Sequence, residues 1–168
     1  MTKQATMKEQ DHAKDNAAAW VSTLAQMVAA LKCDYERLEE LEETEQSGDA
    51  MDEADKEELR ELREAATIDG DRMKDAEEAR ERIQESPLSV QVRSGWRSVG
   101  DDHGDPEEFE ILLSTGGPAL HIRGELGAHC EPSRAWLEYQ DWGTVWTQYF
   151  DVEQTTLLTY CSVFYFGE

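Results

Sequence analysis

The sequence predicts an α+β protein. A long antiparallel helical hairpin, coiled-coil-like in its spacing, precedes an antiparallel β-sheet of four to five strands with a C-terminal helix packed on it. Up to about residue 85, apolar residues recur every three or four positions, which is the period of an amphipathic helix. From residue 88 they alternate with polar residues, which is the period of a half-buried strand. The composition also changes near Ser86, since nearly all aromatic residues follow it. We therefore expect three regions: a flexible N-terminus (1–14), an acidic helical hairpin (15–85) and a sheet with its terminal helix (86–168).

Two apolar stripes define the predicted hairpin. The first helix carries Trp20, Leu24, Val28, Leu31, Tyr35 and Leu38 and ends near Gly48, a residue typical of helix C-termini. The second carries Leu59, Leu62, Ala66, Met73, Ala76 and Ile83. Gly70 lies inside this second stripe and favours a break or kink near "TIDGD". The same stripes could instead pair between two chains, which would make a homodimer through the helices.

The second half contains the strand pattern. Five segments are predicted to be extended: 88–96, 107–114, 119–126, 134–142 and 145–150, the last as a short strand or an extended return. The "TGGP" sequence at 115–118 is predicted to be a turn, because glycine supplies the positive φ that turns need. A terminal helix follows, with Asp151 and Gln154 resembling a capping box.

The charge of the chain limits its partners. The formal net charge is −22 over 168 residues. Such a field repels nucleic acids and anionic membranes and attracts basic proteins. Three cysteines without CxxC spacing indicate a reducing compartment, and from the sequence we expect neither a signal peptide nor an apolar membrane span. We expect a cytoplasmic protein that does not bind nucleic acid directly.

No pattern of residues indicates catalysis. The chain has no GxSxG, HExxH or GxGxxG motif, so we expect no enzyme and no cofactor. The segment "GDDHGDPEE" at 100–108 is dense in oxygen ligands, but its spacing is not that of a calcium loop, and we interpret it as a solvated acidic loop. His121, His129 and Cys130 could meet in space, but they lack the spacing of a zinc site. We therefore expect no metal.

The acidic run "DYERLEELEETE" at 34–45 is the strongest candidate for a functional surface. Its carboxylates are Asp34, Glu36, Glu39, Glu40, Glu42, Glu43 and Glu45, against one Arg37. On a helix they would lie at about one charge per 2.6 Å, and duplex DNA carries one per roughly 1.7 Å. We expect this run to imitate DNA toward a basic groove, with Asp101, Asp102 and Asp105 of the acidic loop extending the surface.

The stretch "EYQDWGTVWTQYF" at 138–150 contains five aromatic rings. Its flanks are acidic, which argues against base stacking. We expect Tyr139, Trp142 and Trp146 to pack between the sheet and the terminal helix. Trp142 and Trp146 lie near a strand end beside Gly143, where their exposed edges could anchor a basic protein.

The blocks "SPLSVQVRSGW", "EEFEILLSTGGPALHIRGEL", "EPSRAWLEYQDWGTVWTQYF" and "FYFGE" resemble a group of small, largely uncharacterised acidic proteins of bacteriophages and prophages. The resemblance covers residues 86–168 and supplies no catalytic residues. It implies a phage accessory protein, and small acidic phage proteins are often inhibitors of host defence of the anti-CRISPR or anti-restriction type.

The sequence therefore favours a non-enzymatic protein that binds and inhibits a basic, nucleic-acid-binding host defence protein or ribonucleoprotein complex. One alternative is a phage structural or assembly protein that oligomerises through its helices. A second alternative is a small-ligand-binding domain that uses the aromatic half.

Overall fold

The computed structural model describes residues 2–100 and 104–167, with side chains described from His12 onward in the first helix. The chain divides into two compact units. One unit comprises Met1–Ser22 together with Gln84–Glu168, and the other comprises Thr23–Ile83. The first of these contains the β-sheet and the second is mainly helical, so the α+β class is confirmed.

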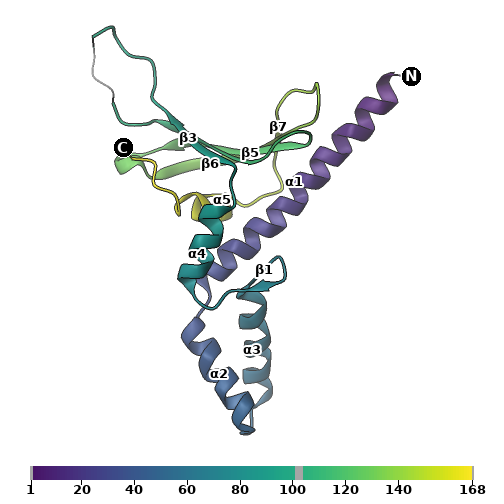
Figure 1. Cartoon of the computed structure of the whole chain (residues 1–168), viewed down its shortest axis with the longest axis vertical. Coiled ribbons are helices and arrows are strands. Elements are labelled where there is room, and N and C mark those ends of the chain that lie inside the picture. Colours follow the sequence, from purple (N-terminus) through teal and green to yellow (C-terminus); the bar gives the residue numbers. More distant parts are fainter. Residues whose placement is uncertain (1, 101–103, 168) are drawn as a thin grey trace. The chain divides into compact units, whose positions relative to one another are not determined.

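The sheet has five antiparallel strands in the order in which they occur along the chain (Figure 1). They are β3 (Ser89–Arg93), β4 (Glu108–Ser114), β5 (Ala119–Leu126), β6 (Pro132–Gln140) and β7 (Thr147–Tyr149). A short 3₁₀ turn, η1 (Ala128–Cys130), connects β5 to β6. All five predicted extended segments contain a strand of the sheet, and the period-two burial of β4 and β6 matches a sheet with one buried face.

The buried face of the sheet forms the core of this unit. Phe109, Ile111, Ile122 and Leu137 occupy neighbouring strands on that face and are almost completely buried. Helix α5 (Gln154–Cys161) packs against β6 and contributes Leu157, Tyr160 and Cys161. The predicted terminal helix is confirmed, but its N-cap is Glu153 rather than Asp151.

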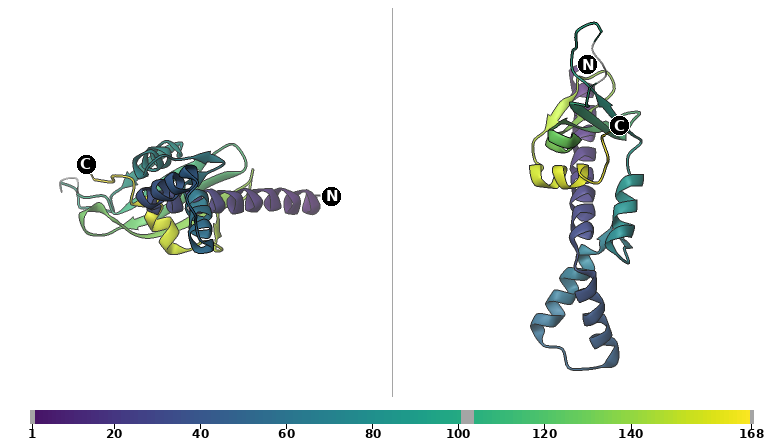
Figure 2. Two further views of the ribbon diagram at one scale, coloured as in Figure 1. Left: turned by 90° about the horizontal axis from the view of Figure 1, so that it is seen from below. Right: turned by 90° about the vertical axis from the view of Figure 1, so that its left-hand side faces the viewer.

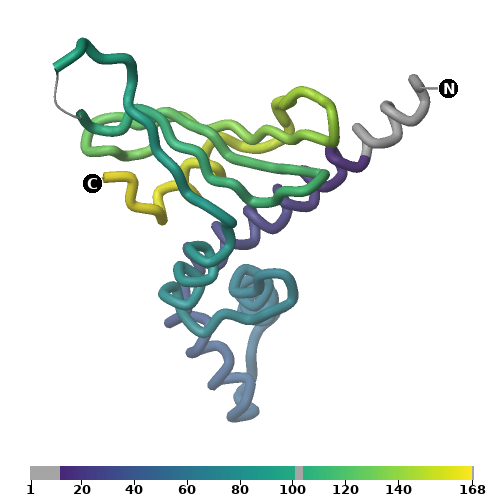
Figure 3. Tube along the Cα trace, turned by 45° about the horizontal axis from the view of Figure 1, so that its top comes forward, coloured from purple at the N-terminus to yellow at the C-terminus, as the bar shows by residue number. Residues whose placement is uncertain are grey.

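The first part of helix α1 (Thr2–Lys32) belongs to the same unit as the sheet. Ala13 and Ala17, one turn apart, are fully buried, so their small side chains allow the helix to approach its neighbours closely. In Figures 1 and 3 the segment of α1 from residue 12 to residue 22 and α5 lie on the same side of the sheet. Together they cover the face that carries the core residues.

The helical unit is more finely divided than two continuous helices. It contains the end of α1, then α2 (Tyr35–Ser47), α3 (Glu53–Ala65), a two-stranded ribbon of β1 (Thr67–Ile68) and β2 (Asp71–Arg72), and most of α4 (Ala76–Glu85). Helices α2 and α3 form a short antiparallel hairpin (Figure 2). Pairing of helices between two chains stays a prediction.

Two local features explain these divisions. The Asp34 side chain accepts a hydrogen bond from the backbone N–H of Arg37, which starts a new helix where the stripe from Leu31 to Leu38 predicts continuity. Further on, Asp69 and Gly70 both have positive φ and close the β1–β2 ribbon. Positive φ at both central residues is the requirement of a type I′ turn, for which Asp-Gly is a preferred sequence.

Helices α2 and α3 are held together by a small apolar core. Leu38 and Leu41 of α2 face Leu59 of α3 and Ala66, which follows it. Cys33, Tyr35, Met51 and Leu62 are partly buried around this cluster. Gly48 ends α2 in the left-handed conformation, as predicted, and donates its N–H to the carbonyl of Glu45.

Strand β3 differs from the half-buried strand that its alternation predicts. Val90 and Val92 pair with Ile111 and Phe109 and therefore point to the core side of the sheet. They are nevertheless 39% and 42% exposed, and the preceding Leu88 is 59% exposed. The reason is position: β3 is the edge strand, beyond the part of the sheet under which the core residues gather.

Candidate functional site

The acidic run lies on α2, which divides its carboxylates between two faces. One face carries Leu38, Leu41, Glu42 and Glu45, at spacings of three, one and three residues, and packs toward α3. The opposite face carries Glu36, Glu39, Glu40 and Glu43, all exposed. The helix therefore separates carboxylates that have partners in α3 and the β1–β2 ribbon from carboxylates that face solvent.

Arginines from several elements engage the inward-facing carboxylates. Glu42 accepts hydrogen bonds from Arg63 at 2.9 Å and from Arg72 at 2.7 and 2.8 Å. The bonds from Arg72, followed by those from Arg63, outweigh desolvation and lower the pKa of Glu42 to about 2. Glu45 lies 2.6 Å from the second terminal nitrogen of Arg63. These two carboxylates therefore join α2 to α3 and β2.

Arg37 makes a second junction at the start of the hairpin. Its guanidinium contacts Glu58 at 2.8 Å and Asp55 at 2.9 Å, both on α3. The same group lies 3.4 Å from Glu40 within α2. Hydrogen bonding to Glu58 is the largest cause of the raised pKa of Arg37, and the charge of Asp55 adds to it.

These junctions change the electrostatic picture of the acidic run. Asp34, Glu42 and Glu45 have partners inside the chain. Arg37 is the one basic residue within 34–45, but Arg63 and Arg72 bring two further positive charges next to this run. Within the described residues, the side chains of Glu36, Glu39 and Glu43 form no hydrogen bond or ion pair. The outward face of α2 is thus the densest remaining acidic surface of the run.

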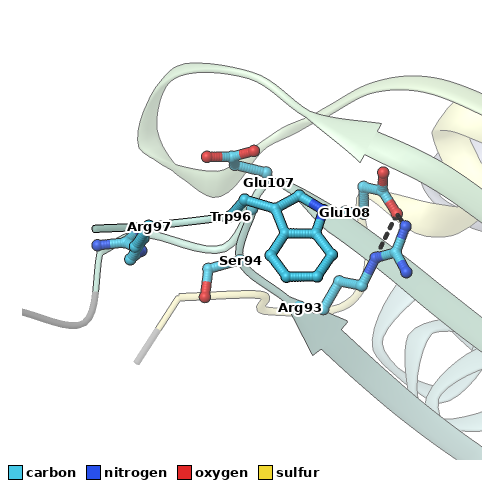
Figure 4. A pocket seen from close by; sticks show the side chains of 7 residues that line it. Arg93, Ser94, Trp96, Arg97, Glu107 and Glu108 are labelled. Atoms are coloured by element: carbon cyan, nitrogen blue, oxygen red, sulfur yellow. Dashed lines mark hydrogen bonds and ion pairs between the residues drawn. The ribbon is translucent and has the colours of Figure 1, made fainter. Parts of the chain in front are cut away.

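The predicted acidic loop is described only in part. Asp101 and Asp102 lie outside the described residues, and Asp105 is exposed. Beside this loop an open cavity of about 620 Å³ is lined by Arg93, Ser94, Gly95, Trp96, Arg97, Glu107 and Glu108 (Figure 4). Arg93 forms an ion pair with Glu108 at 2.6 Å on its wall. The wall therefore carries guanidinium and carboxylate groups together rather than one sign of charge.

The aromatic stretch is only partly core. Tyr139 is buried and meets Tyr149 edge to face, with ring centroids 6.3 Å apart. The prediction that Trp142 and Trp146 pack against the terminal helix is wrong. Trp142 is 77% exposed and lies over Gly117, and Trp146, 37% exposed, stacks on His121 on the opposite face of the sheet.

His121, which the sequence suggests only as a possible zinc ligand, is a buried polar residue. It is 4% exposed, and its Nε2 lies 2.8 Å from Glu138 while its Nδ1 lies 3.3 Å from Glu110. The indole of Trp146 covers the ring at a centroid distance of 3.8 Å and an angle of 10°. Both ring nitrogens therefore face carboxylate oxygens, which can accept hydrogen bonds from ring N–H groups.

Strand register explains why this cluster forms. His121 lies directly opposite Glu138 on β6, and Glu110 is its diagonal neighbour on β4. The alternation of "ALHIRGEL" places His121 and Arg123 on the face opposite to Leu120 and Ile122, which is a signal available in the sequence. With both nitrogens engaged and the ring covered, the cluster is built to hold the β6–β7 loop on the sheet.

His121, His129 and Cys130 do not converge, because His121 lies in mid-strand and the other two lie in η1 after the strand ends. Across residues 2–100 and 104–167, no group of three or more His, Cys, Asp or Glu side chains has the arrangement of a metal site. None of the helices in the described part of the chain has the length and apolar character that a membrane span requires.

Comparison with known proteins gives no relative: no family model matches the chain, and no curated protein or solved structure is significantly similar to it. The likeness of residues 86–168 to phage proteins stays a prediction.

Proposed function

We propose that this chain is a non-enzymatic inhibitor that docks its acidic α2 face on a basic, nucleic-acid-binding protein. The observation that carries the proposal is the exposed row of Glu36, Glu39, Glu40 and Glu43. Residues at spacings of three, four and seven share one side of a helix, so the four side chains present a single negative stripe.

The spacing of this stripe suits a groove that binds one nucleic-acid strand. From residue 36 to residue 43 the helix rises about 10.5 Å, so the mean spacing between neighbouring carboxylates of the stripe along the helix axis is roughly 3.5 Å. One strand of B-DNA carries a phosphate per 3.4 Å. With Asp34, Glu42 and Glu45 engaged inside the chain, the outward stripe matches a single strand better than the whole run matches a duplex.

The hairpin presents the stripe on a fixed scaffold. Leu38 and Leu41 pack on α3. Arg37 of α2 forms an ion pair with α3, and Arg63 of α3 forms one with Glu45 of α2, so the two helices are joined at both ends of the inward face. A binding surface that is already ordered loses less conformational entropy on association. This support favours tight binding by few charges.

Exposed aromatic residues supply a second candidate contact, on the sheet unit. Trp142, Val145 and Phe150 are each more than three-quarters exposed within nine residues. Large exposed apolar groups are uncommon on a protein surface unless they meet a partner, and Trp is a frequent anchor of interfaces. We propose Trp142 as such an anchor, in the same loop whose end is held on the sheet by the stacking of Trp146 on His121.

The resemblance of the sheet half to phage proteins selects among basic partners. It favours a host defence protein, such as a nucleic-acid-binding subunit of a CRISPR or restriction complex. Inhibition would follow from occupation of the groove, because a carboxylate stripe and a nucleic-acid strand cannot neutralise the same arginines and lysines together.

The test is displacement of labelled DNA from such a subunit. The protein should displace a single-stranded probe more effectively than a duplex probe, and displacement should weaken as salt rises. A variant with Glu36→Lys, Glu39→Lys and Glu43→Lys should lose at least about tenfold in potency. Glu42 and Glu45 are left unchanged because they hold the hairpin together.

The matched control reverses three exposed carboxylates on α4, Glu77→Lys, Glu81→Lys and Glu85→Lys, which changes the net charge by the same amount. This control should retain most of the potency. Equal losses in both triple variants would show that only net charge matters. Unchanged displacement by the α2 variant would rule out the stripe as the binding surface. Phage plating on a host with the same defence system tests the same variants in cells.

A further inference from the structure

Strand β3 forms one edge of the sheet and is paired on one side. In the described sheet it has β4 as its neighbour strand, with Ser89 to Arg93 opposite Leu112 to Glu108. Backbone groups along the free side of an edge strand are ready to pair with another strand. Natural proteins commonly block such an edge with proline, a bulge or inward-pointing charges. Between Ser89 and Val92 this strand has none of these.

The free edge also has an uncovered apolar side. Leu88, Val90 and Val92 are 59%, 39% and 42% exposed, although Val90 and Val92 lie on the same side of the sheet as buried Ile111 and Phe109. A strand added beside β3 would therefore extend the apolar face of the sheet as well as its hydrogen-bond ladder. Both gains favour an extended segment over a globular surface as the occupant.

The charge of this edge differs from that of the chain. No carboxylate occurs from Leu88 to Ser94, in a protein with 38 acidic residues. Behind the edge, Glu108 is 2.6 Å from Arg93 and 3.6 Å from Arg123, so its charge is locally compensated. The edge is thus a place where two copies of a strongly acidic chain can approach with little local repulsion.

The side-chain order along β3 is symmetric about Gln91. An antiparallel pair of two β3 strands centred there places Val90 opposite Val92 of the other copy and Gln91 opposite itself. Valine pairs are favoured cross-strand neighbours, and two amide groups can exchange hydrogen bonds. Ser89 would face Arg93, so no like charges oppose each other anywhere in the five-residue register.

We propose that β3 pairs antiparallel with β3 of a second copy of this chain about a two-fold axis at Gln91, which joins two five-stranded sheets into one of ten strands. Such a contact is isologous, as in most homodimers. A ladder of five residues with a narrow apolar strip is a small interface, so the dissociation constant is expected to be on the order of 10 µM. This dimer is independent of the inhibitor function proposed above.

Salt should strengthen this dimer. Two chains of net charge −22 repel each other over a Debye length, and added salt shortens that length. At about 100 µM protein and about 0.5 M NaCl, where screening is nearly complete, sedimentation velocity should show a species of twice the chain mass. Binding of a basic partner by the α2 stripe weakens under the same conditions, so the two proposals give opposite salt dependence.

A charge swap at Gln91 tests the register. Gln91→Lys leaves the monomer intact, because residue 91 lies opposite Glu110 on β4, but it sets two ammonium groups against each other at the axis. Gln91→Glu sets two carboxylates against each other at the axis, and its stability is measured separately because residue 91 also lies opposite Glu110 within the monomer. Each variant alone should be monomeric, and an equimolar mixture should recover the dimer, because lysine then faces glutamate. Circular dichroism of each variant checks that the fold is retained.

Three results would overturn the proposal. One is a wild-type chain that stays monomeric at high salt, which would leave this edge to a strand of a different protein. Another is dimerisation of both single variants as strong as that of the wild type, which would place the contact elsewhere, for example on the helices. The third is a mixture that is no more dimeric than its two components.

Discussion

Nε2 of His121 lies 2.8 Å from Oε2 of Glu138, its direct neighbour across the β5–β6 ladder. On the other side of the ring Nδ1 lies 3.3 Å from Glu110, and the indole of Trp146 closes the site from above. A polar ring is therefore buried on the face of the sheet where alternation predicts solvent. The cost of burying it is offset only while its partners remain in place.

Replacement of Glu138 by alanine is expected to lower the free energy of unfolding by about 1 to 3 kcal/mol, because the buried Nε2 loses its acceptor. Urea unfolding followed by circular dichroism measures the change. Glu138→Gln keeps a hydrogen-bond acceptor without the charge, so its stability should lie between those of the wild type and of Glu138→Ala.

Glu125→Ala is the matched control. Glu125 points to the same face of the sheet, and both side chains of its ion pair with Arg134, at 3.4 Å, are exposed. Exposed pairs contribute about 0 to 1 kcal/mol. If both alanine variants lose the same stability, His121 does not depend on Glu138.

Gly117 supports Trp142 by having no side chain. Its φ is +109°, and a Cβ at this position would overlap the indole ring. Gly117→Ala is therefore expected to cost roughly 1 to 3 kcal/mol from strain and to displace Trp142, which should lose any role as a contact with a partner. Unfolding experiments give the first effect, and the binding assay with the α2 stripe intact gives the second.

Gly143→Ala separates strain from overlap. Gly143 also has positive φ, at +74°, but nothing lies within 4 Å of the position of its Cβ. This control should show the strain alone. In a background that carries Trp142→Ala, Gly117→Ala should cost no more stability than Gly143→Ala, because the indole that its Cβ would overlap is absent. If Gly117→Ala still costs more than Gly143→Ala in that background, the overlap is not the cause.

The central strands of the sheet could be predicted because β4 and β6 alternate between buried and less buried residues. The segment 119–126 was expected with the bounds that β5 has, since Leu120 and Ile122 mark one face and turn residues mark both ends. The helical region was harder. Spacings of three and four continue through Asp34, so the stripe alone does not show that Asp34 caps a new helix.

Other features depend on contacts between distant parts of the chain. The Asp69-Gly70 turn was present in the sequence as a hairpin signal, but the apolar spacing around it favoured a helix. The His121 cluster requires knowledge of the register between β4, β5 and β6. Glu42 is bound by Arg63 and Arg72, which lie 21 and 30 residues further along the chain. The charge density along the sequence therefore overstated the exposed acidity of α2.

The three cysteines should differ in reactivity. Burial raises the pKa of the Cys161 thiol strongly, and burial followed by the charge of Asp34 raises that of Cys33. Cys33 and Cys130 are both partly buried, so iodoacetamide at about pH 8 should reach both, and the raised pKa of Cys33 should slow its modification because the thiolate is the reactive species. Cys161 should react only after unfolding. Peptide mass spectrometry over time measures the order, and early labelling of Cys161 in the folded protein would contradict the packing of α5.

Glu42 should make the stability of the hairpin depend on acid pH. Its pKa is lowered from 4.5 to about 2 by hydrogen bonds from Arg72 and Arg63. A carboxyl group whose pKa is depressed in the folded state stabilises that state fully above the unfolded value, and the effect is lost as the pH falls through the folded value. The contribution of Glu42 is therefore present at neutral pH and disappears between about pH 4.5 and about pH 2.

Glu42→Gln is expected to lower the free energy of unfolding by about 1 to 2 kcal/mol at neutral pH, after allowance for solvent screening around the two arginines. The difference from the wild type should shrink as the pH falls below 4.5 and vanish near 2. Glu43→Gln, one position along on the exposed face, removes the same charge without a partner and should change stability by less than about 0.5 kcal/mol at any pH. Denaturant unfolding of all three proteins over this pH range measures the differences. A pH-independent loss in Glu42→Gln would mean that the ionised form of Glu42 does not stabilise the hairpin.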